Sequence, residues 1–168
     1  MSIEINKILH FEDHEADDKE MKQAFDATLG TGRVYLYDHF GSTDSDNLLS
    51  KIRYLVRGCE CDYIILDHLS IVVSGLEDGD ERRAIDNTMT KLRSLVEELG
   101  CGMLLVSHLR RPSGDKGHEE GVQTSLSQLR GSAAIAQLSD MVIGLERNQQ
   151  SDNPDETTVR VLKNRWSG

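Results

Sequence analysis

Short apolar runs that stop abruptly at polar residues dominate the hydrophobic pattern of this sequence. The most informative run, at residues 61–66, is rich in β-branched side chains and predicts a buried β-strand. Comparable runs at 103–106 and 141–145, and an alternating run at 157–162, predict three more strands. These runs are followed in chain order by Asp67-His68, Ser107-His108, Glu146-Arg147 and Lys163-Asn164-Arg165.

The segments between these runs predict helices and loops. Residues 81–99 carry apolar side chains at spacings of three and four, which predicts an amphipathic helix, and residues 42–58 show the same pattern after a group of capping residues. We also expect a helix at 125–139 and a strand at 33–38. Residues 109–124 lack apolar periodicity and predict a long loop.

A strand, a long helix and a second strand form the parallel crossover unit, so the order of elements indicates an α/β fold. If all the strands are parallel, their polar ends meet at one edge of the sheet, where a nucleotide would bind. Asp67 would then hold a metal ion or orient water beside a phosphate. The alternative is that Asp67 only caps the following turn.

Chain length, net charge and cysteine spacing exclude several classes of function. The chain has 168 residues, enough for one domain with a core, and its net charge of −10 argues against wrapping nucleic acid over the whole surface. A local basic loop remains compatible with that charge. The three cysteines do not have the spacing of a zinc site, and no apolar run approaches a membrane span or a signal peptide. We therefore expect an intracellular protein with ordinary thiols.

Motifs along most of the chain are similar to motifs of one protein family. They are Asp62–Ser74, Asp80-Glu81-Arg82, Ser107-His108-Leu109, His118–Gly121, Leu129–Ser132, Gln137–Asp140, Leu145–Gln150 and Leu162–Gly168. From about Arg33 to Gly168 the chain resembles the RecA-like motor domain of hexameric, DnaB-like replicative DNA helicases. Within that group it is most similar to the helicase half of phage primase-helicases and to their mitochondrial, Twinkle-like relative.

The resemblance implies a RecA-like P-loop NTPase core with a mostly parallel sheet flanked by helices, truncated at both ends. Residues 1–32 would be an acidic arm or helix, the incomplete start of the motor domain. Residues 33–168 would run from the Walker B strand to the arginine finger, with the last strands missing. The cofactors would be ATP, or another nucleoside triphosphate, and Mg²⁺.

The resemblance also assigns roles to residues at the first two strand ends. Asp67 would be the Walker B aspartate that holds Mg²⁺ through its water shell, with His68 beside it at the nucleotide. His108 would be the sensor that contacts the terminal phosphate. The alternative for His108 is a core histidine whose hydrogen bonds are satisfied within the fold.

At the last two strand ends the resemblance makes Arg165 an arginine finger that reaches the nucleotide of a neighbouring subunit. Lys163 would be a second cationic contact, and the alternative is that both are an exposed basic pair on an edge strand. Arg147 would stack on the adenine base, or else pair with Glu146 at the surface.

DNA contact would fall to two segments near the second strand end. One is the loop that carries Arg110, Arg111 and Lys116, and the other is the turn Arg130-Gly131-Ser132. Few aromatic residues lie there, so the pattern favours contact with the phosphate backbone over base stacking. The alternative is that a surface loop carries these cations by chance.

The phosphate-binding loop Gly-x-x-x-x-Gly-Lys-Ser/Thr, the Walker A motif, does not occur in the sequence. We therefore expect the distal part of a ring-forming helicase that translocates on single-stranded DNA, a truncated or split gene product that is inactive alone. Its partners would be single-stranded DNA, other helicase subunits and a separate chain with the Walker A half, in the cytoplasm of a phage-infected bacterium.

Two other readings remain open. The chain could be a non-catalytic interaction module, a decayed motor that associates with an intact helicase. It could also be a metal-dependent phosphoesterase that uses Asp67, His68 and His108 as ligands.

Overall fold

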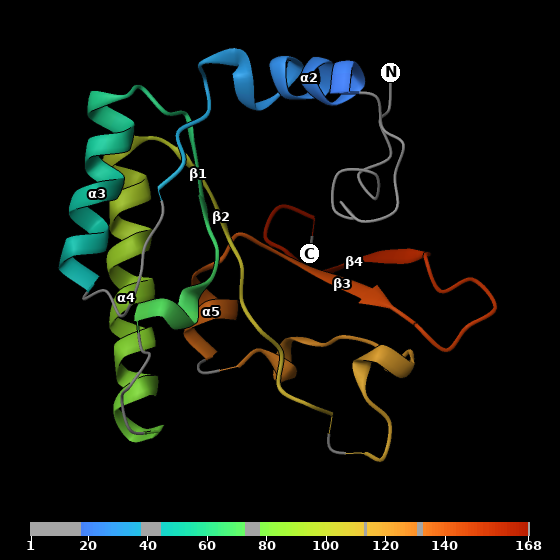
Figure 1. Ribbon diagram of the computed structural model, residues 1–168. Coiled ribbons are helices and arrows are strands. Elements are labelled where there is room, and N and C mark those ends of the chain that lie inside the picture. The colour runs from blue at the N-terminus through green and yellow to red at the C-terminus, as the bar shows by residue number, and fades with distance from the viewer. Residues whose placement is uncertain (1–17, 38–44, 73–77, 113, 131–132, 168) are drawn as a thin grey trace. The chain divides into compact units, whose positions relative to one another are not determined.

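The computed structural model describes residues 18–37, 45–72, 78–112, 114–130 and 133–167, and Figure 1 shows the helices and strands. The chain divides into two compact units, Met1–His39 and Phe40–Gly168. The domain boundary predicted after residue 32 stays a prediction. The described part of the first unit contains the helix α2, Asp18–Ala27, and a 3-10 turn, Leu29–Thr31.

The strand predicted at 33–38 is wrong for the residues that the structure describes. Residues 33–37 belong to neither sheet, and Asp38 lies outside the described residues. Their apolar side chains are exposed, with Leu36 at 83%. Alternation alone does not make a strand, because a strand also needs a neighbour that pairs with its backbone.

The second unit contains the predicted crossover. Its elements are α3 (Ser45–Gly58), β1 (Tyr63–Leu66), η2 (Leu69–Val72), α4 (Asp78–Leu99), β2 (Gly102–Leu105), η3 (His118–Glu120), η4 (Leu126–Gln128), α5 (Ala133–Leu138), β3 (Met141–Arg147) and β4 (Thr157–Asn164). β1 and β2 pair in parallel, from Tyr63 opposite Gly102 to Leu66 opposite Leu105. The helix α4 connects them, as the sequence predicted.

The hydrophobic core of this unit lies where α3, α4 and α5 meet β1. Helix α4 contributes the residues that the 3.6-residue spacing predicted, Ile85, Met89, Leu92 and Leu95, each at most 6% exposed. Ile64 from β1 and Ile135 from α5 complete the contact. Figure 1 shows α3 and α4 side by side next to β1 and β2, so the crossover helix fixes the position of both strand ends.

The predicted meeting of four strand ends at one sheet edge is wrong. β3 and β4 form a separate antiparallel pair in which Arg147 lies opposite Thr157 and Met141 lies opposite Asn164. The segment that joins them is only nine residues long, 148–156, which suits a hairpin and is too short for a parallel crossover. Arg147 and Lys163 therefore lie toward opposite ends of the hairpin.

The single helix predicted at 125–139 is also wrong. A 3-10 turn and the short α5 replace it, and residues 131–132 between them lie outside the described residues. The backbone at the end of the 3-10 turn is paired elsewhere, since Leu129 bridges Leu109 and the Arg130 amide donates to the carbonyl of His108 at 3.0 Å. These bonds to another segment prevent a continuous helix.

We predict that Gly144→Ala destabilises the β3–β4 hairpin. A Cβ atom at Gly144 would overlap the hydroxyl of Thr124, a residue that is only 5% exposed. Overpacking of this kind costs about 1–3 kcal/mol, and urea unfolding measures the loss. The control is Gly114→Ala, because a Cβ there meets no atom within 4 Å. Equal stabilities of the two variants would contradict the predicted overlap.

Candidate functional site

The structure brings three predicted site residues together where β1 and β2 end. The amide of Val106 donates to Leu66 O at 2.9 Å, and the amide of Leu69 donates to Val106 O at 3.0 Å, so the two strand ends stay in register beyond the ladder. The rings of His68 and His108 pack edge to face with centroids 4.3 Å apart. Parallel pairing thus places Asp67, His68 and His108 on one edge.

The carboxylate of Asp67 is accessible to a ligand. Its side chain is 71% exposed, and Nδ1 of His68 lies 3.8 Å from its Oδ1. Mg²⁺ accepts one or two carboxylates, with waters and substrate phosphates filling its other positions. A single exposed carboxylate at a strand end fits that requirement, provided that phosphate oxygens come close to it.

The basic loop after β2 is anchored beside His108. The amide of Arg110 donates to Gln128 O at 2.7 Å, and the amide of Arg130 donates to His108 O at 3.0 Å. Inside the loop, the ring of His118 hydrogen-bonds to the carbonyls of Arg110 and Val122, each at 3.2 Å. The two ends of the loop are therefore bonded to each other and to His108, which follows β2.

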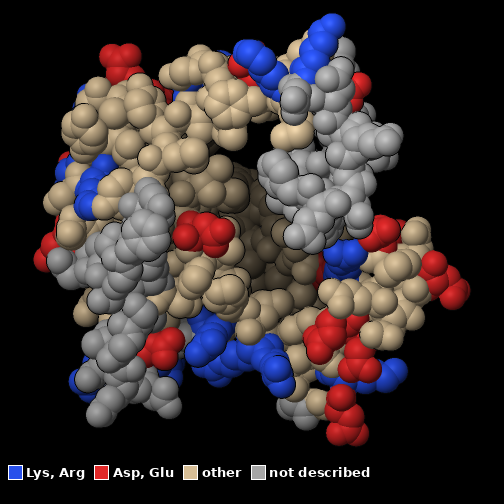
Figure 2. Space-filling model, viewed as in Figure 1, with Lys and Arg blue, Asp and Glu red and all other residues tan. Residues whose placement is uncertain are grey.

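The cationic side chains of this loop face solvent. Arg110, Arg111, Lys116 and Arg130 are all exposed. Figure 2 shows one group of Lys and Arg side chains at the lower middle of the face in view and others scattered around it. Gly131 and Ser132, predicted to contact DNA as well, lie outside the described residues. The loop thus provides exposed charge close to His108.

Arg147 is held at the opposite end of the hairpin from Lys163. Its guanidinium donates to Pro154 O at 2.6 Å and to the carboxylate of Asp155 at 2.8 Å. Glu146, its alternative partner, pairs with Arg160 instead, at 2.7 Å. The stacking role of Arg147 stays a prediction, and its side chain remains half-exposed.

Lys163 has a structural role that the sequence did not indicate. Its ammonium donates to the carbonyls of Ala136, Gln137 and Ser139 at 2.7, 3.2 and 2.8 Å. These contacts occupy all three of its donors and satisfy carbonyls at the end of α5. Contact with a phosphate would require Lys163 to leave the helix end.

Arg165 is positioned by Asp140, a residue to which the sequence gave no role. The Arg165 amide donates to Asp140 O at 2.9 Å, and its guanidinium lies 2.8 Å from Asp140 Oδ1. The other carboxylate oxygen of Asp140 pairs with Arg93 of α4 at 2.6 Å. The hydrogen bond from Arg93 is the main cause that lowers the pKa of Asp140.

Glu146 is the centre of a second charged network. It accepts two hydrogen bonds from the guanidinium of Arg160, at 2.7 and 3.0 Å, and two from the amide and hydroxyl of Thr124, both at 2.7 Å. The hydrogen bonds from Arg160, followed by those from Thr124, lower the pKa of Glu146 from 4.5 to about 2. Sequence patterns missed this network because its partners lie far apart in the chain.

The described residues contain no group of three His, Cys, Asp or Glu side chains placed to hold a metal ion. The described residues therefore do not support the hypothesis of a metal-dependent phosphoesterase. The cysteines are all free thiols. No helix in the described ranges is long and apolar enough to cross a membrane.

Comparisons with known proteins agree with the resemblance found in the sequence. A family model, DnaB-like helicase C terminal domain, matches residues 1–168. The chain is 45% identical over 153 residues to a DNA helicase/primase of Enterobacteria phage T3. The aligned segment covers 91% of this chain and 27% of that protein. It therefore spans about a quarter of the length of this relative.

A solved structure with a similar fold is the KaiC-like protein PH0186 from Pyrococcus horikoshii OT3. It matches with a TM-score of 0.59 and 19% identity, over 90% of this chain and 61% of that one. The likeness confirms the predicted RecA-like α/β fold.

We predict that Glu146→Gln lowers the free energy of unfolding by about 1.5–3 kcal/mol near neutral pH, the usual range for hydrogen bonds to a charged group. Because the folded-state pKa of Glu146 is depressed, this stabilisation is complete above pH 4.5 and is lost as the pH falls toward 2. Urea unfolding between pH 2 and 7 measures both effects.

The stabilities of wild type and Glu146→Gln should accordingly converge as the pH falls. Glu156→Gln, at an exposed position beside the same hairpin, serves as the control and should leave the pH dependence of the wild type unchanged. A constant gap between Glu146→Gln and wild type across this range would rule out the assigned network.

Proposed function

This chain belongs to the family of DnaB-like helicase C-terminal domains, and we propose that it forms the distal part of an ATP-dependent motor that moves on single-stranded DNA. The observation that carries the proposal is that Asp67 and His108 follow two paired parallel strands and that the ring of His68, next to Asp67 in the chain, packs against the ring of His108. A carboxylate for Mg²⁺ and an imidazole that senses phosphate belong side by side at such an edge.

We propose that Asp67 binds Mg²⁺, which would bridge and neutralise the phosphates of ATP. Its exposed carboxylate supplies one ligand of the kind that Mg²⁺ prefers. His108 would hydrogen-bond to the terminal phosphate and transmit the loss of that group to the loop that begins at Leu109. The direct bond between His108 O and the amide of Arg130 connects the sensor to the end of that loop.

The position of Arg165 supports a nucleotide site shared between subunits of a ring. Arg165 lies beyond the end of β4 and Arg147 lies at the other end of the hairpin, seven paired residues away, or about 20 Å at the rise of an antiparallel strand. The two guanidiniums are also bonded at opposite ends of the hairpin, Arg147 to Asp155 and Arg165 to Asp140. We therefore propose that Arg147 serves the chain's own nucleotide and Arg165 that of a neighbour.

The Walker A sequence does not occur among these 168 residues, so we propose that another polypeptide segment provides the amides and lysine that hold the β and γ phosphates. The partners would be single-stranded DNA and further helicase subunits. The relative in phage T3 supports the cytoplasm of a phage-infected bacterium as the place of action.

We predict that the purified chain hydrolyses ATP more slowly than about one turnover per second, the lower end of the usual enzyme range, even with Mg²⁺ and single-stranded DNA. The reason is that the sequence contains no Walker A motif to hold the β and γ phosphates. A coupled steady-state assay measures the rate, and Asp67→Asn identifies any contaminating activity. Turnover above that rate that disappears in Asp67→Asn would show that this chain holds a complete site.

We also predict that Arg110→Ala/Arg111→Ala weakens binding to single-stranded DNA. Each phosphate contact contributes about 0.7 to the slope of log affinity against log salt concentration, so two lost contacts reduce the slope by about 1.4. Fluorescence anisotropy with a labelled oligothymidylate of about 20 nucleotides, longer than the usual site on one domain, measures the slope.

The matched control is Arg82→Ala/Arg83→Ala, an adjacent and exposed arginine pair on α4. It removes the same charge at a distance from the loop in sequence and should leave the slope unchanged. If both double variants reduce the slope equally, binding depends on net charge and the loop is not the DNA site.

A further inference from the structure

The motif His118-Glu119-Glu120-Gly121 lies within the basic loop, and neither the nucleotide contacts nor the DNA contacts proposed above use it. It forms the 3-10 turn η3 and ends in Gly121, whose φ of 87° favours glycine. An Oε atom of Glu120 accepts the amide of Gly117 at 2.8 Å, which closes the turn at its start. The motif therefore produces a tight turn that begins at His118.

This turn is anchored to the hairpin of β3 and β4. The amide of Gln149, two residues beyond β3, donates to Glu119 O at 2.9 Å. A Cβ atom at Gly121 would lie 2.8 Å from the side-chain nitrogen of Asn148, so glycine permits the close approach of the two segments. The second half of the basic loop is thus held against the residues that follow β3.

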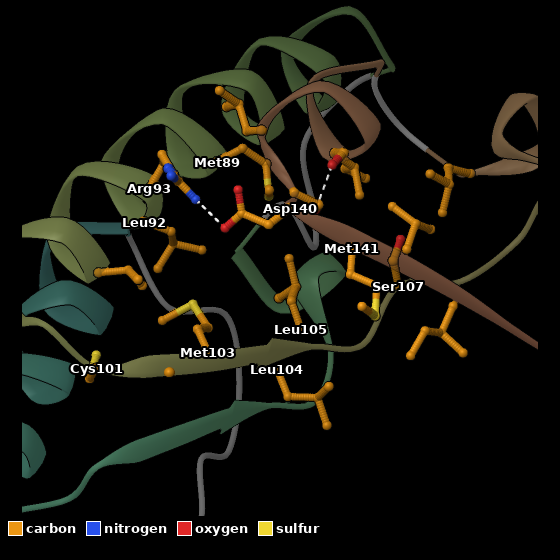
Figure 3. A pocket seen from close by; sticks show the side chains of 18 of the residues that line it. Met89, Leu92, Arg93, Cys101, Met103, Leu104, Leu105, Ser107, Asp140 and Met141 are labelled. Atoms are coloured by element: carbon orange, nitrogen blue, oxygen red, sulfur yellow. Dashed lines mark hydrogen bonds and ion pairs between the residues drawn. The ribbon is translucent and has the colours of Figure 1, made fainter. Parts of the chain in front are cut away.

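The start of the loop has a separate anchor. Ser107, the residue before His108, lines an apolar cavity together with Met141, the first residue of β3. Figure 3 shows both side chains beside this cavity. None of the described residues between Arg110 and Val122 lines it. The cavity therefore positions the end of β2, whereas the shape of the loop itself depends on other contacts.

The ring of His118 supplies such a contact, because it bonds to two backbone carbonyls of the loop. Nδ1 lies 3.2 Å from Val122 O, and Nε2 lies 3.2 Å from Arg110 O. Arg111 and Lys116 lie in the chain between Arg110 and His118, and both are exposed. One imidazole thus connects the two ends of the segment that carries these cations.

The two carbonyls determine which form of the ring can make both bonds. A carbonyl oxygen accepts hydrogen bonds and cannot donate them. Neutral imidazole has one N–H group and can bond to only one of the two carbonyls, whereas the imidazolium has two N–H groups and can bond to both. The geometry around His118 therefore matches the charged ring. Loss of the proton removes one of the two bonds and releases one side of the loop.

The charged groups on the elements around His118 have other partners or face solvent. Glu120 accepts the bond that closes the turn, and on β3 Glu146 pairs with Arg160 and Arg147 pairs with Asp155. The other charged side chains of the turn and the loop are exposed, where salt screens them. They are Arg110, Arg111, Asp115, Lys116, Glu119 and Arg130. The two carbonyls are thus the contacts that depend on the proton of His118.

We propose that the imidazolium of His118 clamps the basic loop in the shape that binds single-stranded DNA, so that DNA binding takes up a proton from solvent at this residue. A loop that is already held in its bound shape loses less conformational freedom on binding. The neutral ring leaves Arg111 and Lys116 on a looser segment. DNA affinity therefore falls as the pH rises through the range in which histidine titrates, about pH 5–8. The DNA part rests on the proposed function, which assigns this loop to DNA contact.

Limited proteolysis with trypsin tests the clamp without DNA, because cleavage reports the population of the opened segment. Cleavage after Lys116 is measured at about pH 6.5 and about pH 8, relative to cleavage after Lys22 on α2, which corrects for the pH dependence of trypsin. We expect the relative rate of wild type to rise about threefold or more, within the limit of about tenfold per pH unit for one proton. His118→Phe keeps a ring without donors and should be cleaved rapidly at both pH values.

Fluorescence anisotropy with a labelled oligothymidylate measures DNA affinity at the same two pH values and at constant salt concentration. The affinity of wild type should fall about threefold or more as the pH rises. His118→Phe and His118→Gln should bind weakly at both values. His14→Gln is the matched control, because it removes the same titratable group from the other compact unit, and it should keep the pH dependence of wild type. His68 and His108 are present in every variant, so their titration cannot produce the difference.

Two outcomes would overturn the clamp. One is cleavage after Lys116 that is equally fast in wild type and in both His118 variants, and the other is a relative rate in wild type that does not change with pH. The second measurement uses wild type alone, so it decides even where a variant fails to fold. If cleavage behaves as expected but wild type and variants bind DNA equally, the loop is not the DNA site. That result contradicts the proposed function and supports the clamp.

Discussion

The arrangement of the larger unit depends on the two-sided ion pair of Asp140. No backbone ladder connects the β1–β2 sheet to the β3–β4 hairpin among the described residues, so side chains must hold the hairpin against the helical core. Asp140 does so with both oxygens, one on Arg93 of α4 and one on Arg165 beyond β4. These guanidiniums keep the carboxylate ionised, since they lower its pKa. A neutral residue at this position would leave the two arginines facing each other without an intervening anion.

The same constraint connects fold and function at the end of β4. Lys163 and Arg165 were assigned to catalysis by resemblance, yet both make contacts that stabilise the chain itself. Lys163 has no donor left after binding the end of α5, whereas Arg165 uses part of its guanidinium on Asp140 and remains half-exposed. Arg165 is therefore the better candidate for a contact with a neighbouring nucleotide. Asp140 would act as its positioning residue, because it fixes both the backbone and the side chain of Arg165.

The sequence predicted what local pattern determines and missed what distant pairing determines. The periodicity of α4, the strands on either side of it and the grouping of Asp67 with His108 follow from apolar spacing and from the geometry of a parallel crossover. The antiparallel direction of β4 follows from the short segment 148–156, and the pattern of apolar residues does not contain that information. The roles of Asp140 and Glu146 depend on partners such as Arg93, 47 positions away, and Thr124, 22 positions away. No local pattern contains that information, and the apparent strand at 33–38 shows that alternation without a partner misleads.

The geometry also explains how the edge proposed for the nucleotide can form within this unit. β1, α4 and β2 bury a core of their own, and packing within this unit places Asp67 and His108 at one sheet edge. What this unit does not satisfy by itself is the open edge of β2 and the apolar face around Leu104.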